Sequence, residues 1–220
     1  IKIAYEHIEM GEAEITDSRS LRSGSVYVAA SEVALRCLLL PVLKKYRLRY
    51  PGIHIRISNH STPQAIAALK GGTADIAVVP TVRSASLTER VIRPVNEVAV
   101  CSPYFSSLAN RQISLSELTN FPLISLGEDT KSFEFYSGFF SSHGLAYRPD
   151  IEAFTADQIL PMVAADLGVG FVPEEFLQSE DVNIIDLKEK IPERNIVLIK
   201  RKEQPLSVAA KELERLIEEC

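Results

Sequence analysis

The sequence is poor in the features that mark several large classes of protein. Its 220 residues include three cysteines, Cys37, Cys101 and Cys220, an odd number at wide spacing. They cannot form a disulfide framework or a paired zinc-ligand motif, so we predict a reducing compartment and a cytoplasmic protein. No apolar run approaches the ~20 residues of a membrane span, and the acidic N-terminus is not a secretory signal. The net charge of −5 argues against a nucleic-acid-binding surface over the whole chain.

The motifs of catalysis and metal binding are also missing. The chain has no GxxxxGK[ST] phosphate loop, GxSxG elbow, HExxH or CxxC. His54 and His60 are about 20 Å apart along an extended strand, so they cannot share a metal while the strand is straight. No side chains form an evident nucleophile–base pair. We therefore predict no metal, no cofactor and no enzymatic activity.

The most informative stretch that is present, Ile53 to Val79, reads as strand, helix and strand. Apolar and polar residues alternate from Ile53 to Asn59, which predicts a strand with one buried face. Thr62-Pro63 opens a helix, with the Thr62 hydroxyl as its cap, and Gly71-Gly72 ends it. The apolar run from Ala74 to Val79 predicts a strand covered on both faces. Such a compact unit predicts a crossover in a parallel sheet.

The rest of the chain repeats this alternation. A strand at 26–31 precedes a helix to Tyr50, in which Pro41 should start, restart or kink the helix. A long extended run, 91–102, contains Pro94 and should pass from one sheet to another. Further strands are predicted at 121–126, 151–154, 169–172, 183–187 and 195–200, and helices at 115–118, 132–143, 156–167 and 205–219. The predicted fold is α/β, with two doubly wound Rossmann-like subdomains joined by two crossing strands.

Two helices allow more than one interpretation. Residues 1 to about 22 carry Ile1, Ile8 and Ile15 at heptad spacing, which suits either a two-helix contact or a surface helix packed on its own domain. Aromatic residues cover most of the circumference of helix 132–143. They predict a helix that is buried on two sides. One of these sides could be a subunit contact or a stacking site for an aromatic ligand, although such rings lie more often in the core.

Polar residues follow the predicted strands at the points where helices begin. In open α/β sheets, ligands bind outside the carboxyl ends of the strands. Free backbone N–H groups at helix starts suit a carboxylate, sulfate or phosphate. The same residue types are ordinary helix caps, so each position alone has a purely structural explanation. These positions are Ser31-Glu32, Ser61-Thr62, Pro80-Thr81, Ser125 to Gly127 and Thr155 to Asp157.

Several segments, in order and spacing, make the chain resemble the effector-binding domain of LysR-type transcriptional regulators. They are GSVYVAAS, LLLPVLKKYRLRYPGIHIRI, LKGGTADIAVV and ADLGVGFVPEEF. The resemblance covers essentially the whole chain and implies a fold like type II periplasmic binding proteins, with a ligand cleft between subdomains. It implies the end of a linker helix at 1–23, subdomain I at 24–95 plus 196–220, and subdomain II at 96–195.

The resemblance also implies site residues and partners. It places Ser31, Thr81, Ser125 and Gly127 at a small-molecule effector, and with the strand-end positions above we take Glu32, Ser61, Thr62 and Thr155 as further ligand contacts. It implies a homodimer or homotetramer that binds DNA through an N-terminal winged helix-turn-helix domain absent from this sequence. The chain departs from the family pattern by about one extra residue between Ser31 and Pro41, and by Glu32. A carboxylate at a helix start disfavours a simple anion and leaves a ligand with an amine possible.

We therefore expect a sensor in which a polar or anionic metabolite alters DNA binding by the full-length protein. A periplasmic solute-binding protein of a transport system has the same architecture and is the alternative. An enzyme such as a deaminase or dehydratase would need an acid/base pair, for which Glu32 and Asp157 are the candidates. The lack of an initiator methionine suggests a fragment or processed product, and 60–90 upstream residues with helix-turn-helix patterning would decide the class.

Overall fold

The structure is a computed structural model that describes residues 21–80, 87–178, 181–202 and 205–220. The helix predicted at the N-terminus lies almost wholly, and Thr81 lies entirely, outside these residues. The chain divides into two compact units. The first contains the described residues up to Ser31, with Leu38–Ile92 and Val197–Cys220, and the second contains Glu32–Cys37 and Arg93–Ile196. Within the described residues, no helix is long and apolar enough to cross a membrane.

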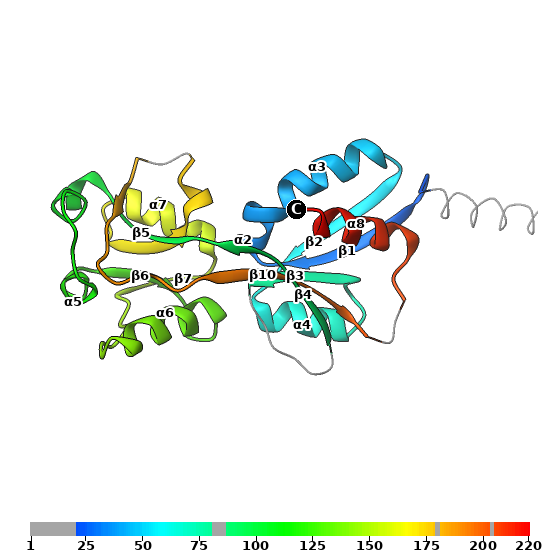
Figure 1. The fold of residues 1–220 in the computed structure, drawn as a ribbon. Coiled ribbons are helices and arrows are strands. Elements are labelled where there is room, and N and C mark those ends of the chain that lie inside the picture. The colour runs from blue at the N-terminus through cyan, green and yellow to red at the C-terminus, as the bar shows by residue number, and fades with distance from the viewer. Residues whose placement is uncertain (1–20, 81–86, 179–180, 203–204) are drawn as a thin grey trace, which may run out of the picture. The chain divides into compact units, whose positions relative to one another are not determined.

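The first unit is built on a five-stranded sheet in the order β2-β1-β3-β10-β4 (Figure 1). Strand β1 pairs in parallel with both β2 and β3, as the strand–helix–strand pattern predicts. The strands are β1 (Gly24–Ala30), β2 (Ile53–Asn59), β3 (Ile76–Pro80), β4 (Leu87–Val95) and β10 (Arg194–Arg201). All five residues of β3 are buried, which confirms the prediction of a strand covered on both faces.

Helices cover both faces of this first sheet (Figure 1). On one face lies α4 (Thr62–Lys70), whose Ala65 and Leu69 pack into an apolar cluster with residues of β1, β3 and β10. On the other face lie α3 (Leu40–Arg49) and α8 (Val208–Glu218). The buried Tyr46 hydroxyl of α3 donates to the Ala209 carbonyl of α8 (2.9 Å). That bond satisfies a polar group that would otherwise be costly to bury.

Pro41 restarts the helix, which is one of the three outcomes predicted for it. The segment after β1 consists of α2 (Glu32–Ala34), a π-helical turn (Leu35–Leu39) and then α3, with Pro41 in its first turn. A π turn closes its hydrogen bonds over five residues and so holds one residue more than an α turn. The segment between Ser31 and Pro41 thus holds one residue more than a regular α-helix would over the same turns.

The edge strand β2 has the predicted bounds, but its predicted buried face is wrong. Only Ile53 of β2 is buried, and Ile57 is 38% exposed. The reason is position, because β2 lies at the end of the strand order and has one neighbouring strand instead of two. Alternation indicates which residues share a face; it does not indicate what covers that face.

The second unit has a five-stranded sheet in the order β7-β6-β8-β5-β9. Strand β6 pairs in parallel with β7 and β8, whereas β5 is antiparallel to β8 and β9. The strands are β5 (Glu97–Cys101), β6 (Leu123–Leu126), β7 (Ile151–Ala153), β8 (Val169–Pro173) and β9 (Asn183–Ile185). The predicted long extended run is thus β4 in one sheet followed by β5 in the other, with Asn96 between them.

Two helices enclose this second sheet, one on each face (Figure 1). Tyr136, Phe139 and Phe140 of α6 (Lys131–Ser142) are buried in the main apolar cluster of the unit, together with Leu115 and Leu118 of the small helix α5 (Leu115–Leu118). On the other face lies α7 (Ile159–Ala164), preceded by a 3-10 turn (Ala156–Gln158). The helix predicted at 156–167 is therefore shorter than expected. It gives way to a turn in which Asp166 has a positive φ, before Gly168.

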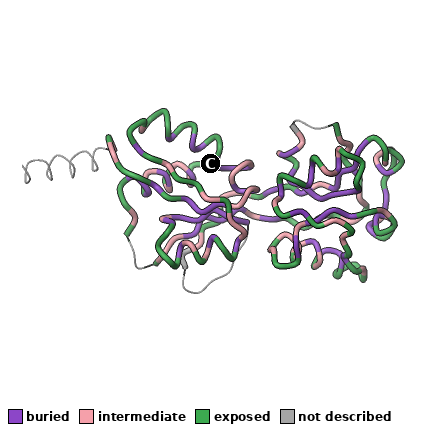
Figure 2. The backbone as a smooth tube through the Cα atoms, turned by 180° about the vertical axis from the view of Figure 1, so that it is seen from behind, coloured by how far each residue is buried: buried purple, intermediate pink, exposed green. Residues whose placement is uncertain are grey.

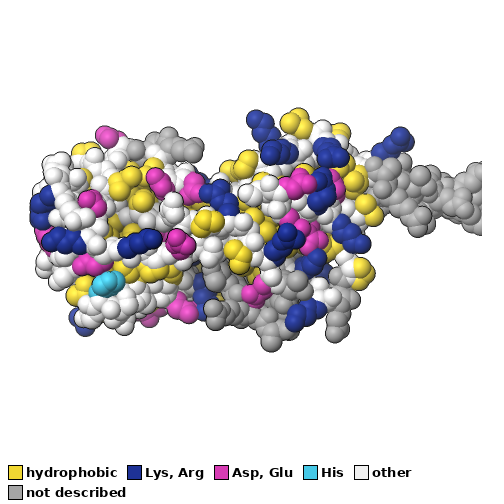
Figure 3. Space-filling view, in the orientation of Figure 1, with side chains coloured by type: hydrophobic (Ala, Val, Ile, Leu, Met, Phe, Trp, Pro, Cys, Tyr) yellow, Lys and Arg dark blue, Asp and Glu magenta, His cyan; other side chains and the backbone are white. Residues whose placement is uncertain are grey.

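Burial in both units is concentrated in the strands (Figure 2). Short 3-10 turns follow β5 at Pro103–Leu108 and β8 at Glu174–Gln178. Lys and Arg side chains gather over α3 on the face shown in Figure 3, where Lys44, Lys45, Arg47 and Arg49 are exposed. Arg36, in the π-helical turn before α3, lies over the Phe176 ring, with its Cζ 4.0 Å from the centroid.

Candidate functional site

In the first unit, the candidate residues Ser31 and Ser61 follow strands that end at the same edge of the sheet. The last residue of β1, Ala30, pairs with Asn59 of β2 and with Val78 of β3. Beyond this point, the Ser31 N–H donates to the Val78 carbonyl (3.1 Å) and the His60 N–H donates to the Ala30 carbonyl (2.9 Å). These bonds hold the strand ends and the start of α4 at one edge, as the sequence predicted.

The cap of α4 is one residue earlier than predicted. Ser61, not Thr62, occupies the N-cap position, and the Gln64 side chain accepts a hydrogen bond from the Ser61 N–H (2.9 Å). Thr62 is the first helical residue and is 5% exposed. Sequence reasoning overlooked the Ser-x-x-Gln spacing, which is the signature of a capping box.

In the second unit, Gly127 and Thr155 follow directly paired ends of neighbouring strands. Leu126 of β6 pairs with Ala153 of β7. After β6 the chain turns tightly, because the Gly127 carbonyl accepts from the Thr130 hydroxyl (2.7 Å) and from the Thr130 N–H (3.0 Å). The Thr130 hydroxyl then caps α6 by accepting from the Phe133 N–H (3.1 Å). A residue larger than glycine at 127 would place its Cβ 2.5 Å from the Glu152 carboxylate.

The loop after β7 is held in a similar way. Thr155 is the N-cap of the turn that leads into α7, and the Gln158 side chain accepts from the N–H groups of Phe154 (2.9 Å) and Thr155 (3.2 Å). The Phe154 ring beside this loop is 88% exposed. The candidate edge of the second unit therefore consists of two braced loops and an exposed aromatic ring.

Ser125 points into the protein. It is 2% exposed, and neither its hydroxyl nor the Tyr147 hydroxyl reaches a partner at normal hydrogen-bond geometry within the described residues. The two hydroxyls are nevertheless close enough to interact. Burial raises the pKa of Tyr147 to about 12, and the Ser125 hydroxyl opposes part of that rise. At this position the strand end offers a ligand the backbone of the loop more readily than the serine side chain.

The acidic pair suggested for acid/base chemistry lies together in the second unit. Glu32 opens α2, which packs on the turn that contains Asp157. Burial raises the pKa of the Glu32 carboxyl, the negative charge of Asp157 raises it further, and Arg36 lowers it in part. The burial and the neighbouring negative charge favour a proton, a cation or a hydrogen-bond donor beside Glu32.

We predict that Glu32→Gln unfolds at a higher temperature than the parent chain at pH 7. A carboxyl whose folded-state pKa is raised stabilises the fold only where it is protonated, and this contribution is lost as pH rises through the folded-state pKa. The advantage of Glu32→Gln should therefore shrink on acidification and vanish below pH 4.5, the ordinary carboxyl pKa. Thermal melts from pH 4 to 8 measure it. An advantage that does not change with pH would contradict the assignment to this carboxyl.

The ion pair with the most buried side chains among the described residues of the second unit was not predicted from the sequence. Arg194 Nη1 donates to Glu97 Oε1 (2.9 Å), and their side chains are 6% and 0% exposed. The Tyr136 hydroxyl donates to Glu97 Oε2 (2.8 Å), and Arg194 Nη2 donates to Ser132 Oγ (3.1 Å). Glu97 opens an otherwise apolar strand, and this was the only local signal of a buried partner.

A second polar group lies beside the π turn. Arg93 Nη2 pairs with Glu175 Oε1 (2.5 Å), and Arg93 Nη1 donates to the Cys37 carbonyl (3.0 Å). Burial and the negative charge of Glu175 raise the pKa of Cys37 to about 12. Its thiol is therefore protonated at neutral pH, unlike that of a reactive cysteine.

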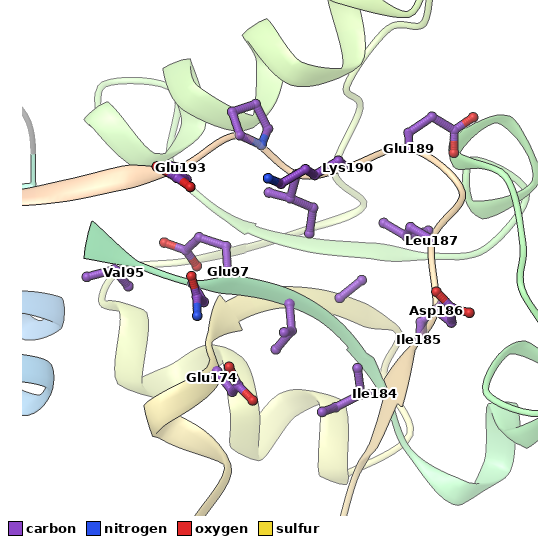
Figure 4. A pocket seen from close by; sticks show the side chains of 15 residues that line it. Val95, Glu97, Glu174, Ile184, Ile185, Asp186, Leu187, Glu189, Lys190 and Glu193 are labelled. Atoms are coloured by element: carbon purple, nitrogen blue, oxygen red, sulfur yellow. The ribbon is translucent and has the colours of Figure 1, made fainter.

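A groove of about 470 Å³ in the second unit lies between β5 and the segment that returns from β9 to β10 (Figure 4). Its apolar lining includes Val98, Ile184 and Ile191, and its rim carries Glu174, Glu193 and Lys190. None of the candidate residues predicted from the sequence lines it. Among the described residues, no group of three or more His, Cys, Asp or Glu side chains could hold a metal ion.

The sequence matches the family model described as the LysR substrate binding domain over residues 19–220. It is 27% identical to the HTH-type transcriptional regulator CysB of Burkholderia cenocepacia, over 69% of this chain and 49% of that protein. It is 23% identical to the transcriptional activator protein LysR of Escherichia coli, over 70% of this chain and 50% of that protein. The chain spans about half the length of these curated relatives.

Solved structures share the fold at low sequence identity. The CcmR regulatory domain of Synechocystis, in complex with 2-PG, aligns with a TM-score of 0.81 at 16% identity, covering 90% of this chain and 97% of that one. The effector binding domain of QuiR, in complex with shikimate, aligns with a TM-score of 0.79 at 15% identity, covering 90% and 96%. The predicted architecture, two α/β subdomains of the type seen in these regulators, is confirmed.

Proposed function

Because the chain belongs to the LysR substrate binding domain family, we propose that it is the effector-binding part of a transcriptional regulator. The observation that carries this proposal is the family match over residues 19–220, joined to a sheet edge in each unit that ends in polar, braced loops. A small metabolite bound there alters DNA binding by the full-length protein, because it binds one arrangement of the protein more tightly than another.

Each unit carries its own set of proposed ligand contacts. In the first unit they are Ser31, Ser61 and Thr62, with Thr81, which lies outside the described residues. In the second unit they are Glu32, Ser125, Gly127 and Thr155. Thr62 and Ser125 are buried, so we assign their contribution mainly to the backbone. Backbone N–H groups in the first turn of a helix bind oxyanions, whereas the N–H groups of Ser31, Ser61 and Thr155 already donate within the protein. The Glu32 carboxylate adds a position that accepts from an amine or hydroxyl. A polar ligand with both kinds of group fits best.

Neighbours in fold indicate the size of ligand to screen. One is in complex with 2-PG and another with shikimate. The transport alternative is not favoured by the relatives, which are transcriptional regulators. We also propose that the chain is not an enzyme, since the Glu32–Asp157 pair has no nucleophile or cofactor assigned to it. For the whole protein, we propose a cytoplasmic location, a homodimer or homotetramer, and a DNA-binding domain. Within this chain, we propose subdomain boundaries at 24–95 plus 196–220 and at 96–195.

A thermal-shift screen of small organic acids, sugar acids and amino acids tests the ligand proposal. A molecule present at 100 times its Kd should stabilise the folded chain by about 2.7 kcal/mol, a readily measured rise in melting temperature. For a hit, Ser31→Ala should weaken binding about tenfold in calorimetry, since it removes one hydrogen bond to the ligand. Ser114→Ala, which changes a helix cap away from these sheet edges, is the matched control. Unchanged affinity in Ser31→Ala would remove Ser31 from the site.

A further inference from the structure

The buried network of the second unit joins three parts of the fold that are distant in sequence. Glu97 is the first residue of β5, and Arg194 is the first residue of β10. Ser132 and Tyr136 lie on successive turns of α6 and contact Arg194 and Glu97 respectively. The Arg194 guanidinium also lies over the Phe135 ring, 4.9 Å from its centroid. Hydrogen bonds therefore connect one face of the first two turns of α6 to the first residues of β5 and β10.

These strand starts lie where the chain enters and leaves the unit. The main segment of the unit begins at Arg93, shortly before Glu97, and ends at Ile196, shortly after Arg194, while Glu32–Cys37 form a separate short segment. The Glu97–Arg194 ion pair thus connects the beginning and the end of this segment, although the two residues are 97 positions apart in the sequence. The position of β5 in its sheet does not require this ion pair, because β5 already pairs with β8 and β9.

The other end of the network reaches the proposed ligand loops. Ser132 follows the turn from Gly127 to Thr130 and lies in the first turn of α6. A small cavity, about 10 Å³, is lined by Glu97, Ser132, Tyr136 and Arg194 on one side. Its lining also includes Leu126 and Ala156, which adjoin Gly127 and Thr155. The network and the loops after β6 and β7 therefore share one small space, about the volume a single water needs.

We propose that Glu97, Arg194, Tyr136 and Ser132 form a coupling element that links the loop after β6 to the two strands by which the chain enters and leaves the unit. Both carboxylate oxygens of Glu97 and two donor groups of Arg194 are committed within it, so a shift of the α6 N-terminus changes the hydrogen bonds of both strand starts. Desolvated charges hold such bonds to a narrow geometry, since an unpaired charge is costly in the interior. These are positioning residues and need not touch a ligand. The inference rests on the proposed function only in naming the loop as a ligand contact.

Hydrogen–deuterium exchange of the Tyr136→Phe variant tests the coupling without any ligand. The substitution preserves the ring and removes only the hydroxyl that donates to Glu97. Exchange should become roughly tenfold faster in three separate segments, the loop 127–132, the start of β5 and the start of β10, because a hydrogen bond to a charged group is lost. Faster exchange confined to α6, or no change, would overturn the proposal.

The matched control is Tyr50→Phe in the first unit. The Tyr50 hydroxyl also donates to a glutamate, Glu212 Oε1, at 2.7 Å. This variant should leave the three segments unchanged and affect only the contact between α3 and α8. If Tyr50→Phe accelerates exchange in the same segments, the effect is one of global stability and the proposal fails.

A second variant separates coupling from simple stability. Glu97→Leu with Arg194→Met replaces the ion pair by apolar side chains, a change that proteins often tolerate. We expect this double variant to melt within a few degrees of the parent chain, because apolar side chains can often replace a buried ion pair. Hydrogen exchange in the loop 127–132 should nevertheless remain faster than in the parent chain, as in the Tyr136→Phe variant. Restored protection of that loop would show that packing alone positions it and would overturn the inference. Failure of the ligand screen would contradict the proposed function and leave this result unaffected.

Discussion

Arg194→Met is expected to lower the free energy of unfolding by about 3–5 kcal/mol, the usual cost of removing one partner of a buried ion pair. The Glu97 side chain is fully buried. Without Arg194, its carboxylate keeps only the hydrogen bond from Tyr136, and the desolvation of its charge is no longer compensated. Urea denaturation at pH 7, with melting temperature as a second measure, gives the loss.

The partner substitution provides the internal control for this prediction. When Glu97→Leu is added to Arg194→Met, the orphaned carboxylate is gone and most of the lost stability should return, because apolar replacement of both partners is often nearly neutral. The double-mutant cycle measures the coupling between the two side chains. A double variant as unstable as the sum of the singles would mean that the two residues contribute independently, contrary to the geometry.

Phe140→Ala is the second large effect, with an expected loss of about 3–5 kcal/mol. Phe140 is fully buried in the main apolar cluster of the second unit. Its ring centroid lies 4.8 Å from that of Tyr147 and 5.9 Å from that of Phe171. Removing the ring leaves a cavity between α6 and the sheet, which the rigid strand residues cannot fill. The same denaturation experiment measures the loss.

Phe154→Ala is the matched control, since it removes the same side chain from a position that is 88% exposed. Its effect on stability should remain within about 0.5 kcal/mol. A comparable loss in both variants would show that Phe154 is covered in solution and that the end of β7 is an interface. A small loss for Phe140→Ala would contradict the described packing of α6.

Most of the secondary structure follows from local pattern. The bounds of β2, α4 and α5 agree with the predicted segments, and Pro94 correctly marks the passage from β4 to β5. These features depend on alternation, turn residues and proline geometry, which act over a few neighbouring residues. Where the predictions are wrong, the cause is usually a neighbour in space. Ile57 is exposed because β2 lies at the edge of its sheet.

The placement of the proposed site residues was partly predictable for the same reason. Ser31, Ser61, Gly127 and Thr155 were proposed because they follow predicted strands, and in each unit the strand register brings such positions to one edge. Side-chain direction was not predictable. Ser125 is buried against Tyr147, and Thr62 lies inside the cap formed by Ser61.

The sequence by itself determined the order and type of the elements, the α/β class and the family resemblance, because each depends on patterns within short segments. Only the tertiary structure decided which charges are buried together. Glu97 and Arg194 are 97 residues apart, and nothing local to either indicates the other. Their pairing arises because β5 and β10 begin beside the same two turns of α6, and a buried charge must find its partner in space.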